Sequence, residues 1–266
     1  MVESTWVRAG VRVLALITLS FLYLPLIILA IHAFNASQFL VWPPTGFTLR
    51  WFVDAATNPA LHKAIINSLL AGMGATALAL VLGTLAAMAV QRFQFFGRDT
   101  VSFLLVLPIA LPGVVTGIAL QTTFRTAGID LGLATIIVGH ATFCVVIVYN
   151  NVIARLRRLP RSSEEASADL GADTFLTFRL ITLPAIRTAL LAGALLAFAL
   201  SFDEVIVTNF TAGPGTQTIP MWILASLQRP RELPVVNVVA FLLILASVIP
   251  VYLAQRIGGD AVGITR

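Results

Sequence analysis

The sequence is poor in charge and in cysteine. Only 11% of its 266 residues are charged, whereas 58% are hydrophobic, and the mean hydropathy is +0.95. Soluble domains contain about 45–50% apolar residues, so this composition excludes a soluble domain. The single cysteine, Cys144, excludes an intrachain disulfide. The net charge of +5 is then better explained by orientation in a membrane than by binding to nucleic acid.

The hydrophobic residues are gathered in runs long enough to cross a bilayer, which requires about 20 residues per helix. Lipid offers no partner to open backbone groups, so each run is expected to be helical. We predict an all-α polytopic membrane protein in which residues 1–266 form a single transmembrane domain with six spans. The first span is expected to stay uncleaved, because it is long for a signal peptide and no small-x-small site follows it. The predicted spans are residues 13–34, 64–90, 100–123, 131–153, 185–210 and 235–254.

The third predicted span contains two prolines, Pro108 and Pro112. Each proline removes a helix hydrogen bond, so a kink is expected there. Gly113 and Gly117 follow at G-x-x-x-G spacing, for which ordinary helix packing is the simplest role. The second span is rich in small residues, which favours close approach of a neighbouring helix.

The basic residues predict the orientation of the chain. With the N-terminus in the cytoplasm, twelve of the 17 basic residues lie on the cytoplasmic side. Both termini and residues 155–184 are then cytoplasmic. On the outer side, residues from about 219 to 227 are too short to span and are expected to form a short surface or re-entrant helix. Trp222 within it is either a periplasmic gate or an interfacial anchor, and Trp42 and Trp51 suit the membrane interface.

A polar stretch interrupts the apolar chain between the fourth and fifth spans. Serines precede glutamates in "SSEEASADLGA", which is a helix-capping pattern. Gly171 is placed to end that helix, and a second short helix is expected before Pro184 leads into the fifth span. Its acidic residues, Glu164 and Glu165 among them, oppose docking on anionic lipid. A protein partner is therefore the expected contact.

The spacing of this stretch resembles a known motif. Glu165, Ala166 and Ser167, then Gly171, then Ile181-x-Leu183-Pro184 are similar to the EAA loop of binding-protein-dependent ABC importer permeases. The one departure is Ser167, where the pattern has alanine. The stretches "LPIALPGVVTGIAL" and "LAFALSFDEVIVTNFTAGPGTQTIPMWI" resemble spermidine/putrescine permeases of the PotC type, including its YdcV-like branch.

This resemblance implies a type I importer permease (MetI-like) fold and a non-catalytic transport subunit. It also implies three protein partners: a second homologous permease, a dimeric ABC ATPase and an extracytoplasmic polyamine-binding protein. ATP and Mg²⁺ would be bound by the ATPase, because this chain has no G-x-x-x-x-G-K-[ST] loop. The residues that the resemblance assigns to the ATPase contact are Glu165, Ala166, Ser167, Gly171, Leu183 and Pro184.

Two carboxylates, Asp203 and Glu204, lie inside the fifth predicted span. A charge at mid-membrane costs about 2.5–3.5 kcal/mol on insertion scales, so it requires a partner or a water-lined path. On a continuous helix, Glu204 shares one stripe with Ser201 and Thr208, whereas Asp203 lies about 80° beyond it. We predict that Ser201, Glu204 and Thr208 face the substrate pathway and that Asp203 either lines its flank or pairs with a neighbouring subunit. A structural ion pair with Arg229 or Arg231 is the alternative.

Other functions remain open at this point. The three histidines lie far apart with no ligand spacing, so no metal site is expected and packing is their ordinary role. An importer permease for another small solute fits the same loop motif. A stand-alone cation carrier that uses Asp203 and Glu204 as an ion relay is a further alternative, although it leaves the spacing from Glu165 to Pro184 unexplained.

Overall fold

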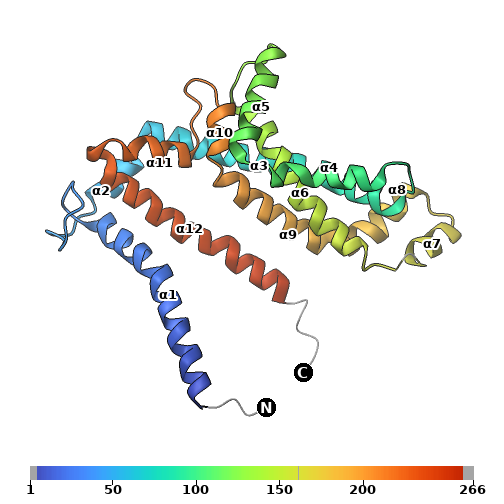
Figure 1. The fold of residues 1–266 in the computed structure, drawn as a ribbon, viewed down its shortest axis with the longest axis horizontal. Coiled ribbons are helices and arrows are strands. Elements are labelled where there is room, and N and C mark those ends of the chain that lie inside the picture. Colours follow the sequence, from blue (N-terminus) through green and yellow to red (C-terminus); the bar gives the residue numbers. More distant parts are fainter. Residues whose placement is uncertain (1–4, 161, 260–266) are drawn as a thin grey trace. The chain divides into compact units, whose positions relative to one another are not determined.

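The computed structural model describes residues 5–160 and 162–259. Helices account for the regular structure of this part of the chain (Figure 1). Its only strand-like pairing is an isolated antiparallel bridge between Asn35 and Phe47. The all-α class expected from the sequence is confirmed.

Among the described residues, five helices are long and apolar enough to cross a membrane, and a sharply bent pair provides a sixth crossing if it counts as one span. The larger of these counts equals the predicted six. The long helices are α1 (Thr5–Phe34), α3 (Pro59–Arg92), α6 (Leu133–Leu156), α9 (Leu183–Phe202) and α12 (Leu233–Gly259), and the bent pair is α4 (Arg98–Ala110) with α5 (Gly113–Thr126). The shorter elements are α2 (Arg50–Ala56), α7 (Ser162–Asp169), α8 (Thr174–Thr177), a π-helical turn (Phe178–Thr182), α10 (Ile206–Thr211), α11 (Ile219–Leu227) and a 3-10 turn (Pro230–Glu232).

By its contacts the described chain forms two compact units. The first contains residues 5–61 and 223–249, and the second contains residues 62–222, without residue 161, and 250–259. The single domain expected from the sequence stays a prediction. The residues that carry the candidate site lie in the second unit.

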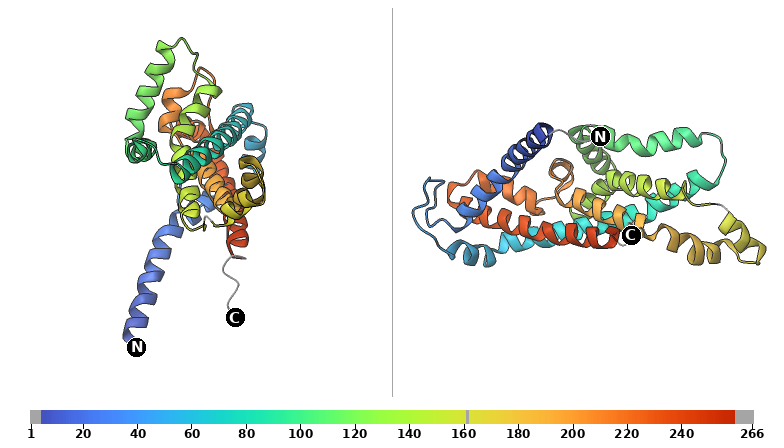
Figure 2. Two further views of the ribbon diagram at one scale, coloured as in Figure 1. Left: turned by 90° about the vertical axis from the view of Figure 1, so that its right-hand side faces the viewer. Right: turned by 90° about the horizontal axis from the view of Figure 1, so that it is seen from below.

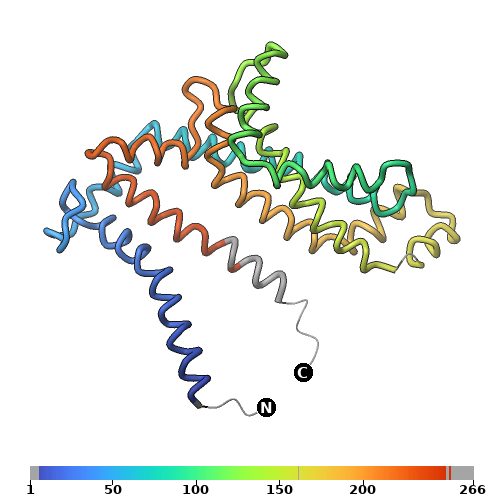
Figure 3. The backbone as a smooth tube through the Cα atoms, in the orientation of Figure 1, coloured from blue at the N-terminus to red at the C-terminus, as the bar shows by residue number. Residues whose placement is uncertain are grey.

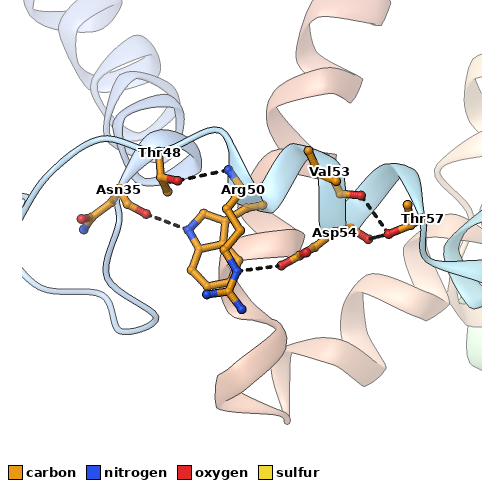
Figure 4. A network of polar contacts seen from close by, with 7 residues as sticks. Asn35, Thr48, Arg50, Val53, Asp54 and Thr57 are labelled. Carbon is orange, nitrogen blue, oxygen red and sulfur yellow. Dashed lines mark hydrogen bonds and ion pairs between the residues drawn. The ribbon is translucent and has the colours of Figure 1, made fainter.

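An aromatic cluster and a polar network organise the first unit. Phe34 at the end of α1 lies 4.9 Å from Phe52 and 5.5 Å from Phe241, measured between ring centroids. The indole N–H of Trp51 donates to the backbone oxygen of Asn35 at 2.8 Å. Figure 4 shows this network, in which Arg50 also pairs with Asp54 at 3.7 Å. Trp51 is buried and its indole N–H bonds inside the protein, so its ring does not face outward from this unit. Its position at the depth of the membrane interface stays a prediction.

Helix α6 is the centre of the second unit. It packs along α9, and it also contacts α4, α5 and α10. Two thirds of its most apolar window is buried, which is the largest share among the candidate spans of the described chain. Val146, Val148 and Val152 are fully buried in this core. The helix positions every other element of the candidate site.

Small residues let α3 approach α6 closely, as the sequence predicted. A side chain at Gly83 would place its Cβ 2.9 Å from both the backbone oxygen of Val145 and the Cβ of Val148. Real Cβ atoms do not approach backbone so closely, so only glycine fits at this helix contact. Gly117 plays the same part in α5, where it packs against the ring of Phe210.

The third predicted span is broken rather than gently kinked. The chain bends by 105° between α4 and α5, and the bend can be followed in Figure 2 and Figure 3. Leu111 is extended, as residues before proline usually are, and Pro112 is the N-cap residue directly before α5. Pro108 is accommodated inside α4, so the break lies at the second proline.

The fifth predicted span also differs from one continuous helix over residues 185–210. The helical run begins earlier, at Thr174, and α9 ends at Phe202. Residues 203–205 are not helical, and α10 starts at Ile206. The Glu204 carboxylate accepts a hydrogen bond from the backbone N–H of Val207 at 2.9 Å. Such local side-chain bonds compete with helix continuation, which explains why the chain restarts here as a new helix.

Candidate translocation site and coupling loop

The two helix breaks face one small cavity of about 160 Å³ in the second unit. Glu204 is the one charged residue among those that line it. The other lining residues come from α4, α5, α6, α9 and α10 and from the segment between α4 and α5: Pro108, Ile109, Leu111, Gly113, Thr116, Phe143, Leu200 and Val207. A single carboxylate in a cavity whose other lining residues are apolar except for Thr116 favours a cation, because it is the one charged group there.

Glu204 is held at this cavity by its own chain. One carboxylate oxygen accepts from the N–H of Val207, and its backbone oxygen accepts from the hydroxyl of Thr208 at 2.7 Å. The other carboxylate oxygen accepts no hydrogen bond within the described part of the chain, so it can accept one from a ligand. The hydroxyl of Thr116, across the cavity, is buried without a partner in the described chain. Both groups accept hydrogen bonds, which is what an alkylammonium donor requires.

The predicted pathway residues do not share one helical stripe, because the helix ends between them. Asp203 is exposed in this chain, Glu204 is partly buried, and Ser201 and Thr208 are fully buried. The single helical stripe predicted for Ser201, Glu204 and Thr208 is therefore wrong, while their place along the substrate pathway stays a prediction. Within the first unit the Arg229 guanidinium pairs with Glu232 at 3.0 Å. The alternative of a structural ion pair from the two carboxylates to Arg229 or Arg231 stays a prediction.

His140 joins the two sides of the break. Its Nδ1 lies 2.7 Å from the hydroxyl of Ser201 in α9, and its Nε2 lies 2.8 Å from the hydroxyl of Thr208 in α10. The side chain is fully buried. Sequence reasoning gave His140 only an ordinary packing role. The available signal was a lone ring with two polar nitrogens inside the apolar run "IIVGHATFCVVIV", since a buried polar group requires partners.

The segment before α11 is fastened to α3. The side-chain amide of Asn67 donates to the backbone oxygen of Gln217 at 2.9 Å, and the Ser68 hydroxyl accepts from the N–H of Ile219 at 2.7 Å. The short helix expected near residues 219–227 is present as α11. Trp222 within it is only 4% exposed. Burial argues against a lipid-facing anchor, while a role as gate stays a prediction.

The polar stretch between α6 and α9 forms a helix with a glycine end, as predicted. After α7, the N–H of Ala172 bonds to the oxygen of Ser167 at 3.1 Å and the N–H of Gly171 bonds to that of Ala168 at 2.9 Å. This pair of bonds is a Schellman ending, and Gly171 has the positive φ of 82° that it requires. The second helix is not separate, because α8 continues through the π-helical turn into α9.

The residues carried over from the EAA pattern divide into two groups. Glu165 and Ala166 are exposed on α7, next to Leu170, whose side chain is 89% exposed. Ser167 faces inward, where its hydroxyl lies 3.0 Å from that of Thr177. The serine at this position therefore supplies a tether that alanine lacks.

Leu183 and Pro184 lie in the first turn of α9 rather than in a loop. Proline has no N–H to continue the helix ladder, and the π-helical turn Phe178–Thr182 stands directly before it. Such turns often absorb a missing bond inside a helix. Pro184 thus marks an adjustment within a long helix, not its beginning.

The chain belongs to the family described as binding-protein-dependent transport system inner membrane component, whose model matches residues 79–259. It is thus a membrane component of a transport system. Over 240 residues it is 37% identical to the putrescine transport system permease protein PotI of Escherichia coli (strain K12), covering 87% of this chain and 84% of that protein. It is 35% identical to the spermidine/putrescine transport system permease protein PotC of the same organism, covering 91% and 90%.

A solved structure supports the fold. A bacterial ABC transporter involved in the import of the acidic polysaccharide alginate contains a chain that superposes with a TM-score of 0.77. The match covers 96% of this chain and 98% of that one at 15% identity. Identity this low supports the fold alone. The type I importer permease fold implied by the sequence resemblance is confirmed.

Substituting Gly171 by alanine is expected to weaken the α7 ending. A left-handed residue with a Cβ costs about 1–2 kcal/mol, so the loop should populate its native form less and substrate uptake should fall a few-fold. Uptake by cells with matched amounts of the protein measures this effect. Gly132→Ala is the control, because Gly132 is extended and has open space around its Cβ position. Equal uptake by the two variants would contradict the assignment.

Proposed function

We propose that this chain is the membrane permease subunit of an ATP-driven importer for polyamines such as putrescine and spermidine. The observation that carries the proposal is the cavity at the two helix breaks, with Glu204 as its one charged lining residue. A protonated amine would bind the free carboxylate oxygen through a charge-assisted hydrogen bond. The names of the PotI and PotC relatives support the same class of substrate. Apolar walls would suit the methylene chain between the amines.

Transport requires partners that this chain does not supply. We expect a second homologous permease, a dimeric ATPase that binds ATP and Mg²⁺, and an extracytoplasmic binding protein that delivers the amine. The exposed face of α7, with Glu165 and Ala166, would dock on the ATPase. The complex would lie in the cytoplasmic membrane with both termini of this chain on the cytoplasmic side. Affinity at the cavity must stay modest, because a site that binds too tightly does not release.

Purification of the tagged chain from its native membrane tests the proposal. An ATPase subunit should co-purify, and amine-loaded binding protein should stimulate ATP hydrolysis by the complex. In uptake assays, unlabelled putrescine or spermidine should compete with the labelled amine, whereas sulfate should not. Amine transport by the chain alone, driven by an ion gradient, would instead support a stand-alone cation carrier. Competition by another small solute would keep the importer and change its substrate.

A further inference from the structure

A closed cluster of three side chains connects three elements of the second unit. Arg92 is the last residue of α3, Glu164 lies in α7, and Thr182 ends the π-helical turn before α9. The Arg92 guanidinium forms an ion pair with the Glu164 carboxylate, and the same Nη2 donates to the Thr182 hydroxyl at 2.8 Å. That hydroxyl donates in turn to Glu164 Oε1 at 2.8 Å. Each member thus contacts the other two.

The side chains of the cluster are less exposed to solvent than those of an ordinary surface ion pair. The side chains of Arg92 and Glu164 are 21% and 26% exposed, and Thr182 is 1% exposed. Solvent therefore screens this pair less than it screens exposed pairs. The bond between Ser167 and Thr177 lies alongside and joins the same two helical segments. Helix α7 is consequently fastened to the run that becomes α9 and, through Glu164, to α3.

Two adjacent glutamates therefore have different surroundings. Glu165 is exposed and free to meet a partner protein, whereas Glu164 is turned inward onto Arg92. The resemblance to the EAA pattern places Glu165 at the ATPase contact, whereas Glu164 has no separate role in that pattern. The difference depends on the position of Arg92, which lies 72 residues away in the chain.

Helix α3 is also fastened at its other end. Asn67 and Ser68 bond to Gln217 and Ile219, directly before Trp222 on α11. Between these contacts and Arg92 the helix is uninterrupted, so it is a stiff connection.

We propose that Arg92, Glu164 and Thr182 form a latch that makes the coupling loop, which here means the segment from α7 to Thr182, move as one body with α3. Motion of the loop is then delivered to α3 as well as to α9, and through α3 to the segment before α11. These three are positioning residues for coupling. The inference rests on the proposed docking of α7 on an ATPase, and it adds a second helix to the moving part.

A charge exchange tests the latch in the assembled complex. Arg92→Glu and Glu164→Arg are each expected to lower putrescine uptake at least 10-fold and to abolish stimulation of ATP hydrolysis by loaded binding protein. The double variant Arg92→Glu/Glu164→Arg should recover at least half of both activities, because the pair is restored with reversed charges. Glu165→Arg combined with Arg92→Glu should show no recovery. The matched control is Arg98→Glu, which makes the same charge change outside the latch and should retain activity.

Spin labels provide a readout that needs no substrate. With Cys144 replaced by alanine, labels at Gln94 and Ala168 report the distance between the end of α3 and α7. With the wild-type latch, the distance between the labels should be the same in the nucleotide-free and the vanadate-trapped complex. In the Arg92→Glu variant, the distance should differ between these two states. A shift in the wild-type latch beyond the rotamer spread of the labels would overturn the proposal, as would full activity of both single variants. A complex that lacks an ATPase would instead refute the proposed function itself.

Discussion

Replacing Glu204 with glutamine in the assembled complex is expected to lower the rate of polyamine uptake by about 10- to 100-fold. A hydrogen bond to a charged group contributes about 1.5–3 kcal/mol, and each 1.4 kcal/mol is a factor of about ten. Glutamine keeps an oxygen that can accept from the N–H of Val207, so the start of α10 should persist while the charge is lost. Uptake of labelled putrescine, with ATP hydrolysis measured in parallel, checks the expectation.

Asp203→Asn is the matched control for this experiment. Asp203 precedes Glu204 directly but is exposed in the chain and is not among the residues that line the cavity. Its amide variant should change uptake by less than about three-fold, which is the scale of a solvated surface charge. Glu204→Asp should lie between the two, because it keeps the charge on a shorter side chain. Unchanged uptake by Glu204→Gln would remove this residue from the pathway.

Replacing His140 with leucine is expected to destabilise the protein by about 2–4 kcal/mol. The substitution leaves the Ser201 hydroxyl without its partner and removes the bond to Thr208, and a buried polar group left unpaired costs about 1–3 kcal/mol. Thermal unfolding of the purified complex should begin about 5–10 °C lower. Uptake should fall as well, because His140 holds together the two helices on either side of Glu204.

A triple variant separates the lost bonds from the lost volume. His140→Leu combined with Ser201→Ala and Thr208→Val removes all three polar groups, and replacing both partners of a bond by apolar groups is often nearly neutral. Much of the stability should return. Uptake should stay low, since the two helices would no longer be fastened across the break. A triple variant as unstable as His140→Leu alone would show that packing, not hydrogen bonding, dominates at this site.

The sequence predicted those features that depend on local pattern. Long apolar runs locate helices because a bilayer leaves the backbone no other structure. Gly171 was correctly placed at the end of α7, since a left-handed helix ending strongly favours glycine. The short helix at Ile219–Leu227 followed from its length alone. These features require no knowledge of which helix lies beside which.

The features that were missed depend on distant neighbours. The break at residues 203–205 was missed because apolar runs flank the two carboxylates on both sides and no proline or glycine marks the end of the helix. His140 acquires its role only when α9 and α10 lie on either side of it. Glu164 and Glu165 are neighbouring residues of the same type, and their roles can be distinguished only when the position of Arg92 is known. A single sequence does not place such residues together.

The two anchored ends of α3 have a consequence for regulation. Free-energy coupling between two sites is reciprocal. If a movement of the loop at Arg92 shifts the segment Gln217–Ile219, then a ligand bound at that segment must shift the loop with the same coupling free energy. Docking of the extracytoplasmic binding protein against that segment would thereby change the position of the loop that contacts the ATPase on the cytoplasmic side. Helix α3 would then transmit conformational changes in both directions across the membrane.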